Sequence, residues 1–427
     1  MTQATTISRC PVSASARDLD LFSDDFILHP YPFLNAVRKE EPVFYNAEIG
    51  YWIVTRYDDV RDCLLNREAF SAANVLEPVT AIYPSTGAIL RDAGVKFGPA
   101  LADEDDPGHG IHRPPIFKNF NPKRLREMES FVHTEATKAL DQIVDRGEAD
   151  LIDDYVFWIP ATVIFHMMRI PEADIPKVRG FVTAMAGLAW GQPDEAEQNR
   201  LAHEVVDYWN YAKQHVLNLK DNLGDDFISD AVRLHIEDEE NWSLDYLTSL
   251  TSNFLFAGHE TTSAQLGSAI RALLENREQW KAICADPSLI PNAIEESLRY
   301  VGSVLAWRRM TKQAVRVGNV EIPEGEKVLV SFGAANRDDC IFSDPDTFDI
   351  TRKNANRHVT FGYGAHTCMG APLSRMEMRV LLEELARRLP SIELVEGQQW
   401  SYPRTVSHRG LHHLLVRWPV PVGGKLP

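Results

Sequence analysis

The sequence of 427 residues has few cysteines, and they are scattered. The five are Cys10, Cys63, Cys284, Cys340 and Cys368, and no C-x-x-C or paired Cys/His spacing occurs among them. An odd number of widely separated cysteines argues against a disulfide framework and against a structural zinc site. It is typical of a protein from a reducing compartment, so we expect a cytoplasmic location.

Positive charge is also scarce. The chain carries 44 Lys and Arg against 61 Asp and Glu, which gives a formal net charge of −17. Contacts to nucleic-acid phosphates need a basic face, so a nucleic-acid partner is not expected. Apolar runs long enough for a membrane helix are missing, and residues 1–20 lack the apolar segment of a signal peptide. A membrane partner is therefore not expected either.

Repeats and low-complexity linkers are absent as well, which predicts a single domain over residues 21–427 after a flexible tail at 1–20. Residues 42–56 carry β-branched and aromatic side chains around Gly50 and predict a hairpin. Residues 121–285 are mostly helical, and a helix of over thirty residues is predicted after an N-cap at Ser243. Strands are predicted over 314–332, an irregular stretch over 335–367 and a last helix over about 369–389. The expected fold class is mainly α with a smaller β part (α+β).

The stretch FGYGAHTCMG, at 361–370, places Cys368 among three glycines and two residues after His366. Cys368 lies where this glycine loop meets the last predicted helix. Unpaired N–H groups and the helix dipole stabilise a thiolate at such a position. The cysteine could then serve as a nucleophile or as a ligand to a soft metal. A lone cysteine is more often an inert core residue, but an inert thiol does not need this surrounding pattern.

The spacing F-G-x-G-x-H-x-C-x-G resembles the haem-ligand loop of the cytochrome P-450 superfamily. The resemblance implies that Cys368 is the axial thiolate ligand of the iron of haem b, where a thiolate favours O–O cleavage. It further implies that Phe361 packs beside the sulfur and that His366 reaches a haem propionate. Segments 40–60, 284–299 and 358–370 are most similar to the haem domain of the bacterial self-sufficient class.

A Glu–Thr pair, Glu260 and Thr261, lies in the apolar middle of the long predicted helix. Polar groups are costly there unless they are used. One interpretation is that the hydroxyl bonds back to the preceding turn and the carboxylate points to water. The resemblance implies instead an acid–alcohol pair that delivers protons to dioxygen, with Ala257 and Gly258 opening the helix groove for oxygen.

Glu296 and Arg299 are three residues apart and share one helix face. Alone, this spacing is a weak signal, because a solvated ion pair explains it equally well. The resemblance implies a buried structural triad with Arg352 that fixes the cysteine loop. A catalytic Glu296 is the alternative that we disfavour.

Haem propionates are carboxylates and need cations. The resemblance implies that they are bound by His109, Arg113, Arg309 and His366. Two neighbours in the sequence, His112 and Arg308, could be mistaken for members of this set. Pro114 and Pro115 follow Arg113 and are typical of a helix start.

Pocket residues follow from the resemblance by position alone, and each is also a plausible core residue. They are Phe97, Leu101, Phe254, Ala257, Val304, Leu305, Ala306, Trp307 and Val406. This set is apolar, so the expected substrate is a small to medium apolar or aromatic molecule. Hydroxylation or oxidative dealkylation is the expected reaction, and a charged clamp for the substrate is not.

The implied activity is a monooxygenase that inserts one oxygen atom of O2. Its electrons would come from a ferredoxin and ferredoxin reductase, or from a fused reductase absent from this chain. The chain has no C-x4-C-x2-C iron–sulfur motif and no Rossmann glycine fingerprint, so it is a stand-alone relative or a truncated haem domain. Basic residues that could steer an acidic ferredoxin are Lys118, Lys123, Arg124, Arg126, Arg375 and Arg379.

Two alternatives stay open. One is a haem-thiolate peroxygenase that uses hydrogen peroxide, against which the Glu260–Thr261 pair argues because that chemistry needs no proton relay to dioxygen. The other is a non-enzymatic haem or gas sensor, which needs an effector domain that the sequence does not show.

Overall fold

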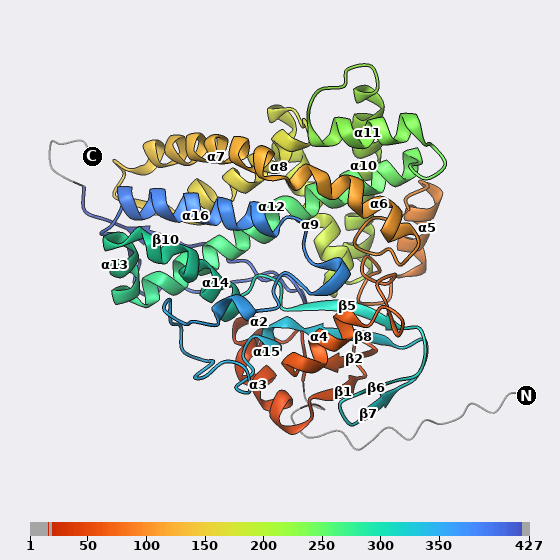
Figure 1. The fold of residues 1–427 in the computed structure, drawn as a ribbon, viewed down its shortest axis with the longest axis horizontal. Helices are drawn as coiled ribbons and strands as arrows, with labels where there is room; N and C mark the ends of the chain where they lie inside the picture. Colours follow the sequence, from red (N-terminus) through yellow and green to blue (C-terminus); the bar gives the residue numbers. More distant parts are fainter. Residues whose placement is uncertain (1–15, 17–18, 97, 421–427) are drawn as a thin grey trace, which may run out of the picture.

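The computed structural model describes residues 16, 19–96 and 98–420, with His259 described by its backbone only. Helices form a broad body, and a smaller sheet with its own short helices lies along one side of it (Figure 1). This confirms the expected mainly α fold class with a smaller β part. No described helix is both long and apolar enough to span a membrane.

The helices have the following bounds: α2 (Asp24–Leu28), α3 (Pro30–Glu40), α4 (Tyr57–Leu65), α5 (Pro84–Asp92), α6 (Gly108–Phe117), α7 (Pro122–Ile143), α8 (Trp158–Met167), α9 (Ile175–Trp190), α10 (Glu195–Leu219), α11 (Phe227–Glu237), α12 (Leu244–Glu275), α13 (Arg277–Ala285), α14 (Ile290–Tyr300), α15 (Phe332–Ala335) and α16 (Ala371–Arg388). The strands are β1 (Val43–Asn46), β2 (Tyr51–Val54), β3 (Phe70–Ser71), β4 (Glu148–Asp150), β5 (Ala306–Thr311), β6 (Val315–Val317), β7 (Val320–Ile322), β8 (Lys327–Ser331), β9 (Glu393–Leu394) and β10 (Leu415–Arg417).

The main sheet has the order β1-β2-β8-β5-β3. The predicted hairpin is confirmed: β1 and β2 pair antiparallel with Val43 opposite Val54, and Gly50 adopts φ +71° in the turn. Strand β2 runs parallel to β8, and β8 pairs antiparallel with β5, so Arg308 lies opposite Leu329. This register places Arg308 and Arg309 on opposite faces of β5.

Helix α12 is the long central helix, and its 32 residues confirm the predicted length. The predicted N-cap is also confirmed, because Ser243 Oγ accepts a hydrogen bond from the Tyr246 N–H at 3.2 Å. Helices α8, α10, α14 and α16 all pack against α12, which explains its apolar middle.

The end of the predicted flexible tail is folded. Ala16 and Leu19 are buried, and Asn46 Nδ2 donates a hydrogen bond to the Leu19 carbonyl at 2.9 Å. The tail prediction is therefore wrong for these residues, because a contact with β1, distant in sequence, holds them. Residues 1–15 and 17–18 lie outside the described part. We keep a single domain over 21–427 as a proposal, since the sheet packs directly against the helical body.

Candidate active site

The glycine loop forms a tight turn that presents Cys368 just before α16. The Cys368 N–H donates to the Phe361 carbonyl at 2.8 Å, which closes the loop. Gly362 and Gly364 have φ of +70° and +74°, a region that side chains disfavour. A Cβ on Gly364 would also lie 3.1 Å from the Leu64 carbonyl of α4. Helix α16 begins at Ala371, two residues later than predicted, so Cys368 precedes its first turn.

Cys368 is exposed to solvent, although many protein atoms surround its thiol. Burial raises the pKa of its thiol, whereas the N–H groups of Gly370 and Ala371 and the charges of Arg113 and Arg375 lower it. The helix-start effect expected from the sequence is thus present, but burial outweighs it. A metal ion at the sulfur deprotonates a thiol outright and would reverse this balance.

Four cationic or hydrogen-bond-donating side chains gather near this loop: His109, Arg113, Arg309 and His366. The rings of His109 and His366 lie 4.2 Å apart between centroids. Arg113 donates a hydrogen bond to the Thr367 carbonyl. Burial, together with the charges of Arg309, His109 and Arg113, lowers the pKa of His366 to about 2. Burial also lowers the pKa of Arg309 to about 10.

This cluster has no anion of its own. Among the described residues, none of its members forms an ion pair, and His109 Nε2 and His366 Nδ1 are buried without a hydrogen-bond partner. Buried polar nitrogens normally have partners, so these indicate a missing acceptor. The two propionates of haem b are acceptors of the right charge, and the open thiol of Cys368 is the ligand that its iron takes. The residues present therefore fit haem.

The two neighbouring residues turn elsewhere. His112 lies against Glu104, with 2.8 Å between Nδ1 and Oε1, and its Nε2 lies 2.9 Å from the Asn241 carbonyl. Arg308 lies over the ring of Trp190. The prediction that Pro114 and Pro115 start a helix is wrong: they lie inside α6, which begins at Gly108 because the His109 N–H already bonds to the Asp105 carbonyl.

On α12, the acid and the alcohol lie in different surroundings. Glu260 is partly exposed, but its Oε2 is buried without a hydrogen-bond partner, so this oxygen does not point to water. Burial raises the pKa of Glu260 to about 7, although the charge of Arg179 opposes this. Thr261 Oγ1 donates to the Ala257 carbonyl at 3.0 Å, the local bond that the simpler interpretation predicts.

On α12, Ala257 is exposed, whereas Gly258 packs against α8. Ala257 is exposed in the middle of α12, whereas the described residues nearest to it on the helix are buried or partly buried. A Cβ on Gly258 would lie 2.4 Å from Ile164 Cγ1 of α8. Gly258 therefore allows α8 to approach α12, which corrects its expected part in opening the groove.

A family model described as cytochrome P-450 matches residues 284–400. Cytochrome P-450 107B1 of Saccharopolyspora erythraea is 34% identical over 393 residues, which cover 90% of this chain and 93% of that protein. This chain belongs to the cytochrome P-450 family. It is a P-450 monooxygenase whose cofactor is haem b.

Solved P-450 structures resemble the whole described fold. The haem domain of CYP116B5 from Acinetobacter radioresistens is 35% identical with a TM-score of 0.92, over 95% of this chain and 98% of that one. Full-length CYP116B46 from Tepidiphilus thermophilus is 36% identical with a TM-score of 0.93, over 96% of this chain. This chain spans about half, 54%, of that longer protein. The predicted similarity to haem domains of the self-sufficient class is confirmed.

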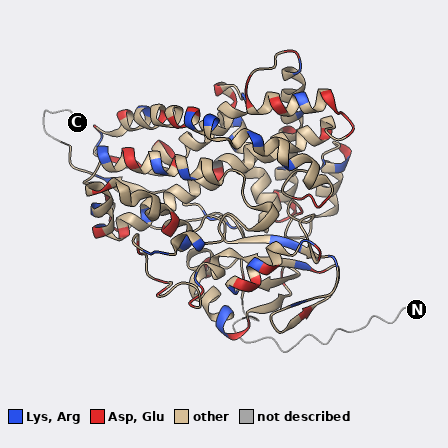
Figure 2. Ribbon diagram, viewed as in Figure 1, with Lys and Arg blue, Asp and Glu red and all other residues tan. Residues whose placement is uncertain are grey.

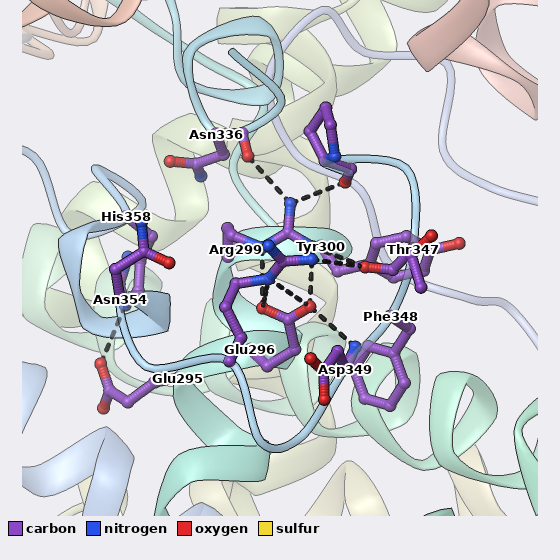
Figure 3. Close-up of polar contacts among 12 residues, drawn as sticks. Glu295, Glu296, Arg299, Tyr300, Asn336, Thr347, Phe348, Asp349, Asn354 and His358 are labelled. Atoms are coloured by element: carbon purple, nitrogen blue, oxygen red, sulfur yellow. Dashed lines mark hydrogen bonds and ion pairs between the residues drawn. The ribbon is translucent and has the colours of Figure 1, made fainter. Parts of the chain in front are cut away.

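Glu296 of this P-450 lies between two guanidinium groups (Figure 3). Arg299 Nε and Nη2 each donate to its carboxylate at 2.7 Å, and Arg352 Nε lies 3.1 Å from both oxygens. The three side chains are buried, with exposed fractions of 0%, 1% and 7%. Both arginines also bond to carbonyls of the irregular stretch, including that of Thr347. The contacts match the predicted triad, so an isolated solvated pair is excluded.

A second ion network beside the triad was not predicted. Glu295 accepts hydrogen bonds from Arg375 at 2.6 and 3.0 Å and from His358 Nε2 at 3.2 Å. Although burial favours the neutral acid, these bonds lower the pKa of Glu295 to about 2. The Arg375 guanidinium lies 4.6 Å from the ring centroid of Phe361, whose carbonyl accepts the hydrogen bond from the Cys368 N–H. The Glu295–Glu296 doublet was the available sequence signal.

The predicted pocket residues divide by exposure. Leu101, Leu305, Ala306 and Val406 are buried in the core. Ala257 is exposed, and Val304 and Trp307 are partly exposed. Phe254 packs with Phe120 and Phe227, on the side of α12 next to α11. Phe97 lies outside the described residues.

A separate hollow lies among α9, α10, α12 and the segment before α6. Its volume is about 320 Å³, which includes the space where it opens to solvent. Its lining includes Met185, Tyr208, Trp209, Ser249, Ser252 and Asn253. None of the predicted pocket residues within the described chain lines it.

Proposed function

We propose that this P-450 hydroxylates or oxidatively dealkylates a small to medium apolar or aromatic substrate. The observation that carries the proposal is the exposed Ala257 in the middle of the buried helix α12, on the helix that holds Thr261. The partly exposed side chains of Val304 and Trp307 offer apolar and aromatic surface for such a substrate. When bound, haem supplies the redox chemistry of dioxygen activation.

Within this proposal, Cys368 ligates the iron and Phe361 packs beside the sulfur. The propionates are held by His109, Arg113, Arg309 and His366. Support comes from their convergence without an anion and from the two unpartnered imidazole nitrogens. The triad of Glu296, Arg299 and Arg352 then fixes the chain that leads into the cysteine loop.

Glu260 and Thr261 are proposed to handle protons. A carboxylic acid with a pKa of about 7 exists in both protonation states near neutral pH, as a proton donor that must be reloaded requires. Thr261 Oγ1 bonds to the carbonyl of Ala257, and this places the hydroxyl at the exposed part of the helix. We propose that Glu260 passes protons at its carboxylate and that Thr261 orients the group that receives them.

Electrons are proposed to come from a ferredoxin and its reductase, or from a reductase fused in a longer chain. Four of the six expected steering residues already have carboxylate partners: Arg124 with Asp230, Lys123 with Glu127, Arg375 with Glu295 and Arg379 with Glu129. Lys118 and Arg126 are exposed and form no ion pair within the described chain. These two therefore carry the steering proposal.

Charge reversal tests the steering. The double variant Lys118→Glu, Arg126→Glu is expected to slow reduction by an acidic ferredoxin about tenfold at low salt, and the difference should shrink as salt rises. Reduction rates are measured by stopped flow, and substrate affinity should not change. The matched control reverses Lys281, an exposed lysine on α13. Equal reduction rates for the double variant and the control would remove these residues from the docking surface.

The reaction itself is tested with the haem-loaded protein, NADPH, a surrogate ferredoxin and reductase, and alkylbenzenes of increasing size. Oxygen from ¹⁸O2 should appear in a hydroxylated product, and the Cys368→Ala variant should form none. Product formed only from hydrogen peroxide would favour the peroxygenase instead. Ligand binding without any product under either condition would favour a sensor.

A further inference from the structure

Arg308 is a buried cation without a counter-ion. Its exposed fraction is 0%, and its guanidinium carbon lies 3.4 Å from the ring centroid of Trp190. Nε, Nη1 and Nη2 are all buried without a hydrogen-bond partner. The carboxylate that acts on it electrostatically, Glu77, is half-exposed and pairs with Lys327 at 3.1 Å. A guanidinium stays charged at neutral pH, so this site lacks an anion.

A second polar group without a partner lies in the same surroundings. His408 is 7% exposed, and both of its ring nitrogens are buried without a hydrogen bond. Burial and the charge of Arg308 lower the pKa of His408 to about 4, so the ring is neutral at pH 7 and offers one N–H donor. Tyr51 Oη also lies near Arg308, but the two make no hydrogen bond of acceptable geometry.

Aromatic rings enclose these groups. The His408 ring lies 5.4 Å from that of Trp190, 5.3 Å from that of Phe256 and 6.4 Å from that of Trp307. The rings of Trp190 and Trp307 are 5.3 Å apart. The unpaired nitrogens therefore lie within a wall of apolar surface, which is the environment in which a charged hydrogen bond is strongest.

The cluster adjoins the predicted pocket. Phe256 directly precedes the exposed Ala257 on α12, and the ring of the predicted pocket residue Trp307 lies 6.4 Å from that of His408. His408 also forms an isolated backbone bridge with Val304. The basic stretch of β5 is visible between the helical body and the rest of the sheet (Figure 2). The polar cluster thus lies at the β5 end of the surface proposed for the substrate.

We propose that Arg308 and His408 form an anion-binding subsite that takes the carboxylate of an aromatic carboxylic acid. The aromatic ring of the acid packs among Trp190, Trp307 and Phe256. One guanidinium and one neutral imidazole carry a single positive charge, which matches a carboxylate better than a phosphate dianion. The subsite rests on the proposed function, because it names the substrate class of the same pocket, and it replaces the expectation that no charged clamp exists.

The competing explanation is structural. Arg308 could serve only to stack on Trp190 at the end of α9, since a guanidinium over an indole ring is itself favourable. In that case an anionic ligand gains nothing over a neutral one of the same shape, and it suffers the cost of leaving water. The two explanations therefore predict opposite orders of affinity in the unaltered protein.

The test uses the haem-loaded protein and isothermal titration with 4-propylbenzoate, its neutral analogue 4-propylbenzamide, and 4-propylphenyl phosphate. We expect the benzoate to bind at least tenfold more tightly than the benzamide and more tightly than the phosphate. Equal or weaker binding of the benzoate overturns the subsite, and tightest binding of the phosphate overturns its assignment to a carboxylate. These comparisons need no variant, so a folding defect cannot obscure them.

Variants then assign the residues. Arg308→Gln should abolish the preference for benzoate, while Arg316→Gln, an exposed arginine on β6, should retain it. His408→Gln provides a second variant in case Arg308→Gln does not fold, and it should reduce the preference at least threefold. A preference unchanged in each folded variant overturns the assignment. If 4-propyltoluene is oxidised but the benzoate binds no more tightly than the benzamide, only the subsite is overturned. If none of the probes is oxidised, the proposed function is overturned as well.

Discussion

Replacing Glu296 with glutamine should destabilise this P-450 more than most single substitutions would. Glu296 accepts hydrogen bonds from Arg299 at 2.7 Å twice, from Arg352 Nε at 3.1 Å and from the Asp349 N–H at 2.9 Å. Glutamine keeps the shape but removes the carboxylate that forms ion pairs with both buried guanidinium groups. The amide N–H groups of the glutamine would also face the N–H donors of the two arginines, so neither side could accept a hydrogen bond.

The size of the effect follows from that burial. Breaking a buried ion pair by removing one partner costs about 3–5 kcal/mol, because the other charge stays buried and unpaired. Two cations lose their anion here, so we expect about 4–5 kcal/mol. A folded domain has only about 5–15 kcal/mol in total, so this loss is about a quarter of it or more.

Urea unfolding of the haem-loaded protein, followed by far-UV circular dichroism, measures this loss. The Glu296→Gln midpoint should be far below that of the unaltered protein, with an unchanged slope. Glu278→Gln is the matched control, because Glu278 pairs with Lys281 at 2.8 Å on the exposed face of α13. A Glu296→Gln midpoint as high as that of this control would refute the triad as a stabilising element.

Two further predictions concern pH. Because burial raises the pKa of Glu260 to about 7, the fraction of reducing equivalents that ends in product should fall as pH rises through about 7. Glu260→Gln should lower that fraction about tenfold and make it independent of pH between 6 and 8.5. If the fraction falls with pH equally in the variant and in the unaltered protein, Glu260 does not handle protons. Although burial lowers the pKa of His112, its bonds to Glu104 and to the Asn241 carbonyl raise it above the usual value of about 6.5. The stabilisation from His112 should therefore be complete below about pH 6.5 and be lost as pH rises through the higher folded-state pKa. The urea midpoints of the unaltered protein and His112→Gln should thus differ more at pH 5.5 than at pH 9, and a constant difference would exclude this ion pair.

Local signals in the sequence predicted the parts of the fold that depend on neighbours along the chain. The N-cap at Ser243, the hairpin around Gly50 and the i,i+3 pair of Glu296 and Arg299 each involve residues a few positions apart. Steric and hydrogen-bonding rules act over that range, so the pattern determines the geometry. The start predicted for α6 was wrong because proline is unfavourable inside a helix, so the sequence rule places Pro114 and Pro115 in a first turn, whereas α6 already begins at Gly108.

Contacts between distant segments could not be predicted in the same way. The Glu295–Arg375 bond joins residues 80 positions apart, and the bond from Asn46 to Leu19 fixes the end of the presumed tail. The resemblance implies that Gly258 opens the oxygen groove, and nothing in the sequence reveals that Ile164 of α8 packs against it. The resemblance, and no local pattern in the sequence, favours Arg309 over Arg308 as the propionate-binding residue. The structure supplies its physical reason, because the register of β5 turns the two side chains to opposite faces.

The distribution of unpaired charge gives these observations a common meaning. The chain has a net charge of −17, and many surface arginines, such as Arg124 and Arg379, have carboxylate partners. Three arginines beside the active site, Arg113, Arg308 and Arg309, form no ion pair within the described residues. Buried arginines elsewhere, such as Arg38, donate to neutral oxygens, whereas Arg308 has no partner of either kind within the described residues, and a buried charge without a partner is strongly unfavourable. In the proposed function, the two haem propionates balance Arg113 and Arg309. Arg308, on the opposite face of β5, then needs one further negative charge, and a substrate carboxylate is the anion that the neighbouring aromatic rings can also bind.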